Sequence, residues 1–218
     1  MNSPQIVGLG GAPADSMLDH VLGLARGRKV LYVGTADMEN PERALDLTNR
    51  LGASVLRFNP WPPADLREVA LSHDVILVGG GNTANMLAIW RVHGFDEVLR
   101  EAWQSGVVLA GWSAGMICWF EAGVTDSFGP QLEGMDCLGW LTGSACPHYD
   151  GEERRRPRYR ELIDGGFPEG LAADDGVGLH FVGTELREVV SARAGATCYR
   201  VEPGTERPLD ARLLTNPS

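Results

Sequence analysis

The sequence predicts an α/β fold with a doubly wound, mostly parallel sheet. Short apolar runs alternate with segments of helical spacing along the first half of the chain, as in a parallel sheet covered by helices on both faces, a three-layer sandwich. Two of these runs, residues 74–78 and 107–111, lead into glycine-containing turns. Open α/β sheets place their sites at the carboxyl ends of strands, so both turns are candidate parts of a functional site.

The first half of the chain alternates between expected strands and expected helices. We expect strands within residues 5–11, 29–34, 53–58, 74–78 and 107–111, and helices within residues 15–26, 41–51, 65–72, 83–91 and 95–103. Pro41 suits a first helical turn, Asn82 or Thr83 can cap the helix that follows, and Gly94 can end it. The turn after the first strand lacks the G-x-G-x-x-G spacing of dinucleotide-binding folds, because Pro13 interrupts it.

The second half of the chain has weaker patterns. Residues 121–140 lack clear periodicity, and we expect them to wrap over the site. An arginine-rich run at residues 154–160 leads into a helix that extends through residue 163. Short β-segments are expected at 171–173, 177–181, 188–191 and 197–201, because their residues alternate between turn signals.

Size and composition favour one domain that acts on a small molecule. The 218 residues, 44% of them hydrophobic, suffice for one well-filled core, so we expect a single domain over residues 1–218. The formal net charge of −10 argues against nucleic acid or an anionic membrane as a partner. Neither a signal peptide nor a membrane span is recognisable, so a cytoplasmic location is expected. The four cysteines form no C-x-x-C pair, and we expect core thiols, no metal and no cofactor.

The segment Gly111-Trp112-Ser113-Ala114-Gly115 has the pattern of a nucleophile elbow. In such an elbow a serine sits on a strained turn between a strand and a helix, and small residues on either side leave room for it. Ser113 is therefore the expected nucleophile, and the amide of Ala114 could face a developing oxyanion. A turn of small residues that merely packs a helix onto a sheet would look the same.

A second candidate element is the run Gly79-Gly80-Gly81-Asn82. Successive glycines let backbone amides approach an anion closely, which favours contact with an oxyanion or a substrate carboxylate. A flexible turn is the alternative interpretation.

A nucleophilic serine needs a histidine as its base, and the chain has five histidines. His20 and His93 lie on expected helices, and His73 precedes a strand on the side away from the site. His180 lies within an alternating strand, where a structural histidine is common. His148 follows a proline in an irregular polar segment and is the preferred base.

These motifs together resemble the family of dipeptidase E, the aspartyl dipeptidase, and its relative cyanophycinase. The resemblance rests on residues 78–83 (VGGGNT), 111–115 (GWSAG) and 147–148 (PH), in that order and ahead of an arginine-rich helix start. It implies a class I glutamine-amidotransferase-like, flavodoxin-like sandwich with a serine at the elbow. In that family the matching residues are the nucleophile, Ser113, and the base, His148. The resemblance also implies an oxyanion hole at Gly80 and Ala114, flanked by Gly79 and Gly81.

The resemblance implies two further roles. An acidic residue precedes a glycine just before the final β-segment of the family, and Asp175 matches it, although Asp174 and Asp126 stay open as the third triad member. This chain carries aspartate where glutamate is expected, and its segment between His148 and the arginines is shorter. Arg155 aligns with the family's substrate-binding arginine.

The expected function is therefore a serine peptidase that hydrolyses short peptides, above all dipeptides with an N-terminal aspartate, through an acyl-enzyme. Two alternatives remain at this point. One is a peptidase or amidase of the same fold with another side-chain preference, and the other is a non-catalytic binding protein. A short peptide is the expected partner, and a homodimer stays open.

Overall fold

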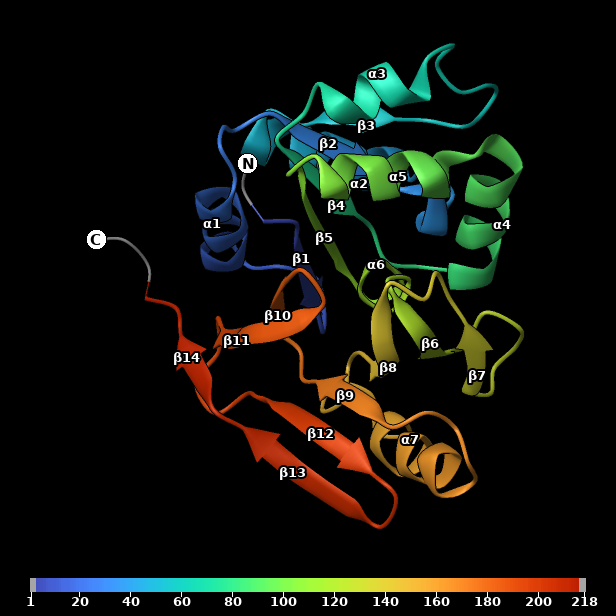
Figure 1. Cartoon of the computed structure of the whole chain (residues 1–218), viewed down its shortest axis with the longest axis vertical. Helices are drawn as coiled ribbons and strands as arrows, with labels where there is room; N and C mark the ends of the chain where they lie inside the picture. The colour runs from blue at the N-terminus through green and yellow to red at the C-terminus, as the bar shows by residue number, and fades with distance from the viewer. Residues whose placement is uncertain (1–2, 216–218) are drawn as a thin grey trace.

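The computed structural model describes residues 3–215, which form two sheets joined by a shared hydrophobic core (Figure 1). The first sheet has eight strands, in the spatial order β14 (Ala211–Leu213), β11 (Glu185–Ser191), β10 (Val177–Val182), β1 (Gln5–Leu9), β5 (Val108–Trp112), β4 (Val75–Val78), β2 (Val30–Val33) and β3 (Ser54–Leu56). Its five strands from the first half of the chain are mutually parallel. β10 pairs with β1 in the antiparallel direction and extends the sheet on that side.

The apolar runs explain why β2, β4 and β5 lie inside this sheet. All residues of these three strands are buried, as expected for parallel strands with helices on both faces. β1 also lies inside the sheet, but its two neighbours, β5 and β10, come from distant parts of the chain. The carboxyl ends of β1, β4 and β5 meet at one edge, where the sequence places its glycine turns.

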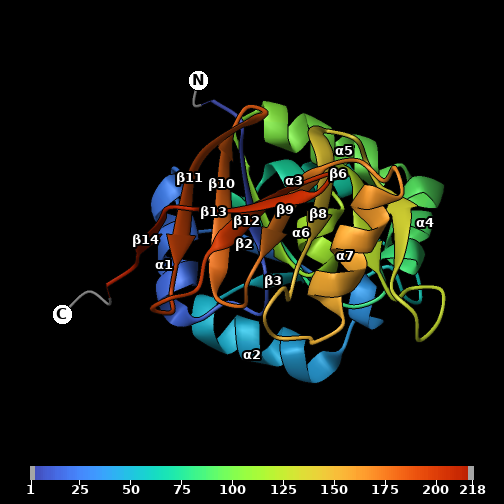
Figure 2. The same cartoon turned by 90° about the horizontal axis from the view of Figure 1, so that it is seen from below.

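Helices cover both faces of the first sheet, which confirms the three-layer sandwich (Figure 2). The helices of the described residues are α1 (Asp15–Leu24), the short 3₁₀ helix η1 (Thr35–Asp37), α2 (Pro41–Leu51), α3 (Leu66–Leu71), α4 (Thr83–His93), α5 (Phe95–Gln104), α6 (Ala114–Ile117) and α7 (Arg155–Asp164), of which α7 packs on the second sheet instead. α1 and α2 pack on one face, and α3 to α6 pack on the other. No helix between residues 3 and 215 combines the length and the apolar character needed to cross a bilayer.

Side-chain caps set the starts of α2 and α4. The Asn40 side chain accepts hydrogen bonds from the amides of Glu42 and Arg43, ahead of Pro41 in the first turn of α2. Asn82 caps α4, and Gly94 ends it in the left-handed conformation.

The second sheet occupies the lower half of Figure 1 and has six strands. They are β13 (Thr205–Leu209), β12 (Cys198–Glu202), β9 (Gly170–Ala173), β8 (Leu141–Cys146), β6 (Phe120–Thr125) and β7 (Glu133–Asp136). Tyr159 and Ile163 of α7 pack on one face of this sheet, against Val124, Ala172 and Val201. Its other face closes the core that α3 to α6 share with the first sheet.

No helix or strand is predicted within residues 121–140, but β6 and β7 pair there as an antiparallel hairpin. Glycines interrupt the alternation of apolar and polar residues that would predict these strands. Gly123 lies against Ile117, where a Cβ would come within 2.6 Å of the isoleucine Cβ. β7 is an edge strand whose residues are half-buried or exposed, so it lacks the alternation that predicts a strand. The elbow helix α6 is correspondingly short, since the chain leaves it to enter β6.

Candidate active site

Ser113 occupies a strained turn between β5 and α6. Its φ of 55° and ψ of −110° lie outside the regions that residues with a side chain normally adopt. The two glycines of the motif make the turn feasible. A Cβ on Gly111 would lie 2.6 Å from the Gly115 carbonyl oxygen, and a Cβ on Gly115 would meet the Val78 carbonyl. The segment therefore has the local geometry that the G-x-S-x-G pattern predicts.

The glycine loop after β4 lies directly beside this serine. A Cβ on Gly80 would lie 3.1 Å from the Cβ of Ser113 and 2.9 Å from the indole nitrogen of Trp112. Within residues 3–215, the amides of Gly80, Gly81 and Ala114 donate to no protein acceptor, whereas Gly79 donates to Val33 in the sheet. Unbonded amides next to a serine hydroxyl are the donors from which an oxyanion hole is built.

The side chain of Asn82 is already engaged. Its Oδ1 accepts a hydrogen bond of 2.9 Å from the Asn85 amide, and its Nδ2 donates over 3.0 Å to the Ser127 carbonyl. The Ser127 hydroxyl also accepts from the Ala84 amide. Asn82 thus attaches the loop after β6 to the start of α4 and positions the glycine loop through the backbone.

His148 and Asp175 form the clearest polar pair of the site. His148 Nδ1 lies 2.7 Å from Asp175 Oδ1, with side chains 21% and 44% exposed. The backbone of His148 has a positive φ of 54°, so this residue too is held in an uncommon conformation. Because Nδ1 faces the carboxylate, Nε2 is the ring nitrogen left for another partner. This arrangement matches the base and orienting acid of a triad.

The carboxylate of Asp175 fits between two glycines. A Cβ on Gly11 would collide with Oδ1, and a Cβ on Gly151 would collide with Oδ2. The amide of Asp175 donates over 2.8 Å to Asp150, which is paired in turn with Arg193. Asp150 was missed at the sequence level, although its position two residues after His148 could have drawn attention to it. No sequence signal pointed to Arg193.

Two other aspartates were candidates for the third triad position. Asp174 is buried, and its carboxylate accepts a hydrogen bond of 3.0 Å from the Thr197 amide. Burial raises the pKa of Asp174, an effect that the Thr197 amide partly opposes. Asp126 is exposed in the loop after β6, and within residues 3–215 its carboxylate makes no ion pair or hydrogen bond. Only Asp175 of the three contacts His148.

Arg155 is the buried arginine of α7, only 4% exposed. Its guanidinium donates to both carboxylate oxygens of Glu152, at 2.8 and 3.2 Å, and to the Val124 carbonyl over 3.2 Å. Val124 belongs to β6, the strand whose following loop holds Asn82. Arg155 is therefore linked to the glycine loop through β6, and its charge is already paired.

The remaining histidines do not join this pair. His73 Nδ1 contacts the Val69 carbonyl, and His93 packs against Phe58. His20 and His180 lie together near Glu188. Among the described residues His148 is thus the histidine in contact with an aspartate.

Fold and site together are those of an α/β protein with a serine elbow, and comparison with known proteins identifies the family. The model of peptidase family S51 matches residues 11–189. The chain therefore belongs to peptidase family S51, which confirms the resemblance to dipeptidase E found in the sequence.

Individual relatives agree with this assignment. An uncharacterized peptidase of Bacillus subtilis strain 168, YgaJ, is 57% identical over 145 residues, which cover 66% of this chain and 62% of that protein. The chain thus spans less than two thirds of the length of this curated relative.

Two solved structures share the fold. A peptidase from an acI-B1 Actinobacterium superimposes with a TM-score of 0.69 at 19% identity, covering 96% of this chain and 95% of that one. A putative peptidase E protein from Listeria monocytogenes EGD-e superimposes with a TM-score of 0.64 at 16% identity, covering 88% and 100%. At these identities the likeness concerns the fold.

Proposed function

We propose that the chain is a serine peptidase that hydrolyses short peptides, above all dipeptides with an N-terminal aspartate. One observation carries the proposal. A strained serine with unbonded amides beside it lies at the same end of the sheet as a histidine in contact with an aspartate. A turn that served packing alone would need neither the strain nor the unbonded amides.

The proposed reaction proceeds through an acyl-enzyme. Ser113 Oγ attacks the carbonyl carbon of the peptide bond while His148 Nε2 takes its proton, and Asp175 stabilises the resulting imidazolium. The amides of Gly80 and Ala114 hold the oxyanion. His148 then gives the proton to the leaving amine, which departs as the C–N bond breaks. Water, activated by the same histidine, hydrolyses the ester and restores Ser113.

The cysteines support a serine rather than a thiol nucleophile. All four are unpaired and buried. Burial raises the pKa of Cys137 and of Cys146 to about 12 and that of Cys118 well above its usual value, so the reactive thiolate is scarce at neutral pH. Unpaired thiols also accord with action in the reducing cytoplasm.

Arg155 supports the aspartate preference. A buried guanidinium can bind a carboxylate through two parallel hydrogen bonds, which a lysine cannot do. In this structure Glu152 supplies that carboxylate. In the proposed complex the substrate's aspartate takes the place of Glu152, which is 48% exposed and free to turn into solvent.

The same pairing favours a second candidate function, a peptidase of this fold with another side-chain preference. If Glu152 keeps Arg155 neutralised, the site has no free cation for an aspartate. A substrate with an uncharged or basic first residue would then be the better one.

A panel of dipeptides separates these functions. We expect hydrolysis of Asp-X dipeptides with a higher kcat/KM than that of Asn-X, Ala-X and Lys-X dipeptides, and labelling of the protein by a fluorophosphonate probe that Ser113→Ala removes. Labelling with a different preference would favour the second candidate. If the protein were neither labelled nor able to hydrolyse any dipeptide, it would be a binding protein.

A further inference from the structure

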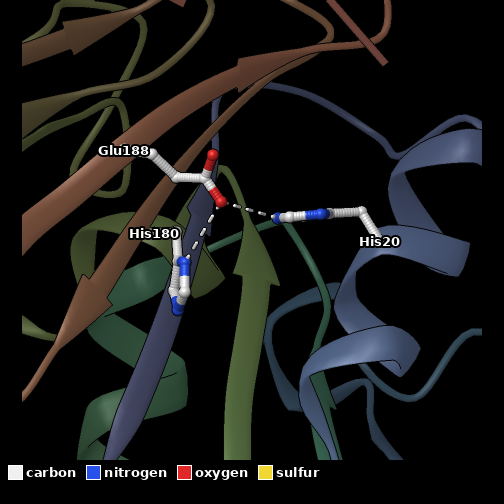
Figure 3. A group of neighbouring side chains, drawn as sticks. All are labelled: His20, His180 and Glu188. Atoms are coloured by element: carbon white, nitrogen blue, oxygen red, sulfur yellow. Dashed lines mark ion pairs between the residues drawn. The ribbon is translucent and has the colours of Figure 1, made fainter. Parts of the chain in front are cut away.

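Three side chains from distant parts of the sequence meet outside the candidate active site (Figure 3). His20 comes from α1, His180 from β10 and Glu188 from β11. His180 and Glu188 are cross-strand neighbours, and α1 covers them from one face of the sheet. Both histidines point toward the same carboxylate oxygen. Oε1 of Glu188 lies 3.5 Å from His180 Nδ1 and 3.9 Å from His20 Nε2.

The hydrogen bonds of Gln5 define the tautomer of His180. Gln5 Nε2 donates to the Leu24 carbonyl over 3.3 Å, so Gln5 Oε1 is the atom that faces His180. That oxygen lies 2.8 Å from His180 Nε2, and an amide oxygen can only accept. Nε2 of His180 therefore carries the proton, and Nδ1 presents a lone pair toward Glu188.

This arrangement brings electron-rich atoms together with nothing positive between them. His180 Nδ1 and His20 Nε2 are both buried, and within residues 3–215 neither has a hydrogen-bond partner. Buried polar atoms without a partner are rare and costly. A cation among the three atoms would satisfy all of them.

We propose that His20 Nε2, His180 Nδ1 and Glu188 Oε1 bind a divalent transition-metal ion, with Zn²⁺ as the best fit. Two neutral imidazoles and one carboxylate oxygen are ligands that Zn²⁺ prefers, with water at the fourth position. Around a tetrahedral Zn²⁺ with bonds of about 2.0–2.2 Å, ligand atoms lie about 3.3–3.5 Å apart. All three atoms here lie within 4.8 Å of one another, so small side-chain rotations complete the site.

Outer partners hold two of the three ligands. Gln5 orients His180, as described, in the way that metal-bound histidines are held by a second hydrogen bond. Arg212 donates twice to Oε2 of Glu188, at 3.1 and 2.9 Å, which leaves Oε1 for the ion. The ion would join α1 to β10 and β11, so its role is to stabilise this part of the fold.

Titration of the metal-free protein tests the proposal. After chelator treatment and dialysis, calorimetry with ZnCl₂ at pH 7.5 should show one site per chain, and Zn²⁺ should raise the melting temperature. Co²⁺ should bind with the visible absorption of a tetrahedral complex, whereas Mg²⁺ should have no effect. His20→Gln and His180→Gln should each weaken Zn²⁺ binding by more than the 10- to 100-fold that loss of an outer partner costs.

Two controls keep the result interpretable. His93→Gln, on the exposed end of α4, and His148→Ala, in the candidate active site, should bind Zn²⁺ as the unmodified chain does. His20→Gln without metal should melt near the temperature of the metal-free protein, which separates loss of the site from loss of the fold. The proposal would be overturned if the unmodified chain bound no Zn²⁺, or if His20→Gln and His180→Gln both bound Zn²⁺ as tightly as the unmodified chain.

Discussion

The backbone amides of Ser113 and His148 are bound by consecutive carbonyl groups of one segment. Ser113 donates to Leu9 over 3.1 Å, and His148 donates to Gly10 over 2.9 Å. Gly10 itself donates to Val177, the first residue of β10, which follows Asp175 closely. The end of β1 therefore holds Ser113, His148 and the segment that carries Asp175 in place relative to one another, although the three residues come from separate parts of the chain.

Ser113→Ala and Ser113→Gly should both abolish hydrolysis, with a loss of about 10³-fold or more in kcat/KM. They should differ in stability. Glycine adopts the backbone angles of residue 113 without strain, whereas alanine in this position remains strained. The free energy of unfolding of Ser113→Gly should therefore exceed that of Ser113→Ala by about 1 kcal/mol. Denaturant titrations of the two variants measure this difference. Retained turnover in either variant would remove Ser113 from the mechanism.

Asp175→Asn should lower kcat by about 10³- to 10⁴-fold, because it removes the charge that stabilises the imidazolium and favours the wrong tautomer of His148. Asp174→Asn can still accept from the Thr197 amide, and Asp126 is exposed, so both variants should keep kcat within a few-fold. Steady-state kinetics of the three variants rank them. A larger loss in Asp126→Asn than in Asp175→Asn would transfer the role to Asp126.

Gly80→Ala should lower kcat/KM by about 10²- to 10³-fold, as loss of one oxyanion-hole donor does. The added Cβ would press on Ser113 and Trp112 and displace the loop amide. Gly23→Ala in α1 is the matched control, because nothing lies within 4 Å of its Cβ position. That variant should keep full activity. Equal activity of the two variants would place the oxyanion elsewhere.

Arg155→Met should lower kcat/KM for Asp-X dipeptides by roughly 30- to several-thousand-fold, the equivalent of about 2–5 kcal/mol for a desolvated charge pair. Ala-X dipeptides should be affected little. Arg160→Met, exposed on the same helix, should match the unmodified chain.

Glu152→Gln covers the case in which Arg155→Met fails to fold. It keeps the arginine and weakens its internal partner, so the KM for Asp-X dipeptides should fall. Equal effects of Arg155→Met on both substrate types, together with an unchanged KM in Glu152→Gln, would move the aspartate pocket away from Arg155.

Thiol reagents should leave the native protein active at pH 8, because all four cysteines are buried and burial raises the pKa of Cys146 to about 12. Colour release from a disulfide reagent should approach four thiols per chain only after unfolding. Rapid inactivation that substrate prevents would show a cysteine close to the chemistry.

Local sequence patterns predicted the elements that local physics determines. Buried strands, helix caps such as Asn82 and the tight turn at Ser113 each follow from a few neighbouring residues. The same holds for His148, whose contact with Asp175 agrees with its preference over the other histidines. The resemblance, rather than spacing, singled out Asp175 over Asp174.

Features that depend on distant contacts escaped prediction. β7 and β8 contain glycines and lack alternation, so only their neighbours in the second sheet define them as strands. The pair of Asp150 with Arg193 and the group around Glu188 join segments that no sequence window contains. The sequence alone therefore indicated only a structural role for His180 within its strand.

The central place of β1 in the sheet affects the order in which its strand pairs can form during translation. β1 leaves the ribosome before both of its neighbours and can pair with β5 once residue 112 has emerged, but its other edge stays open until Val177–Val182 follow. An open strand edge in a nascent chain can pair with neighbouring chains. We therefore expect chaperones to bind the nascent chain between the synthesis of β5 and that of β10. A chain stalled before residue 175 would already carry Ser113 and His148 and still lack Asp175, the carboxylate that contacts His148. Translation thus completes the proposed nucleophile and base before the aspartate that would make them active.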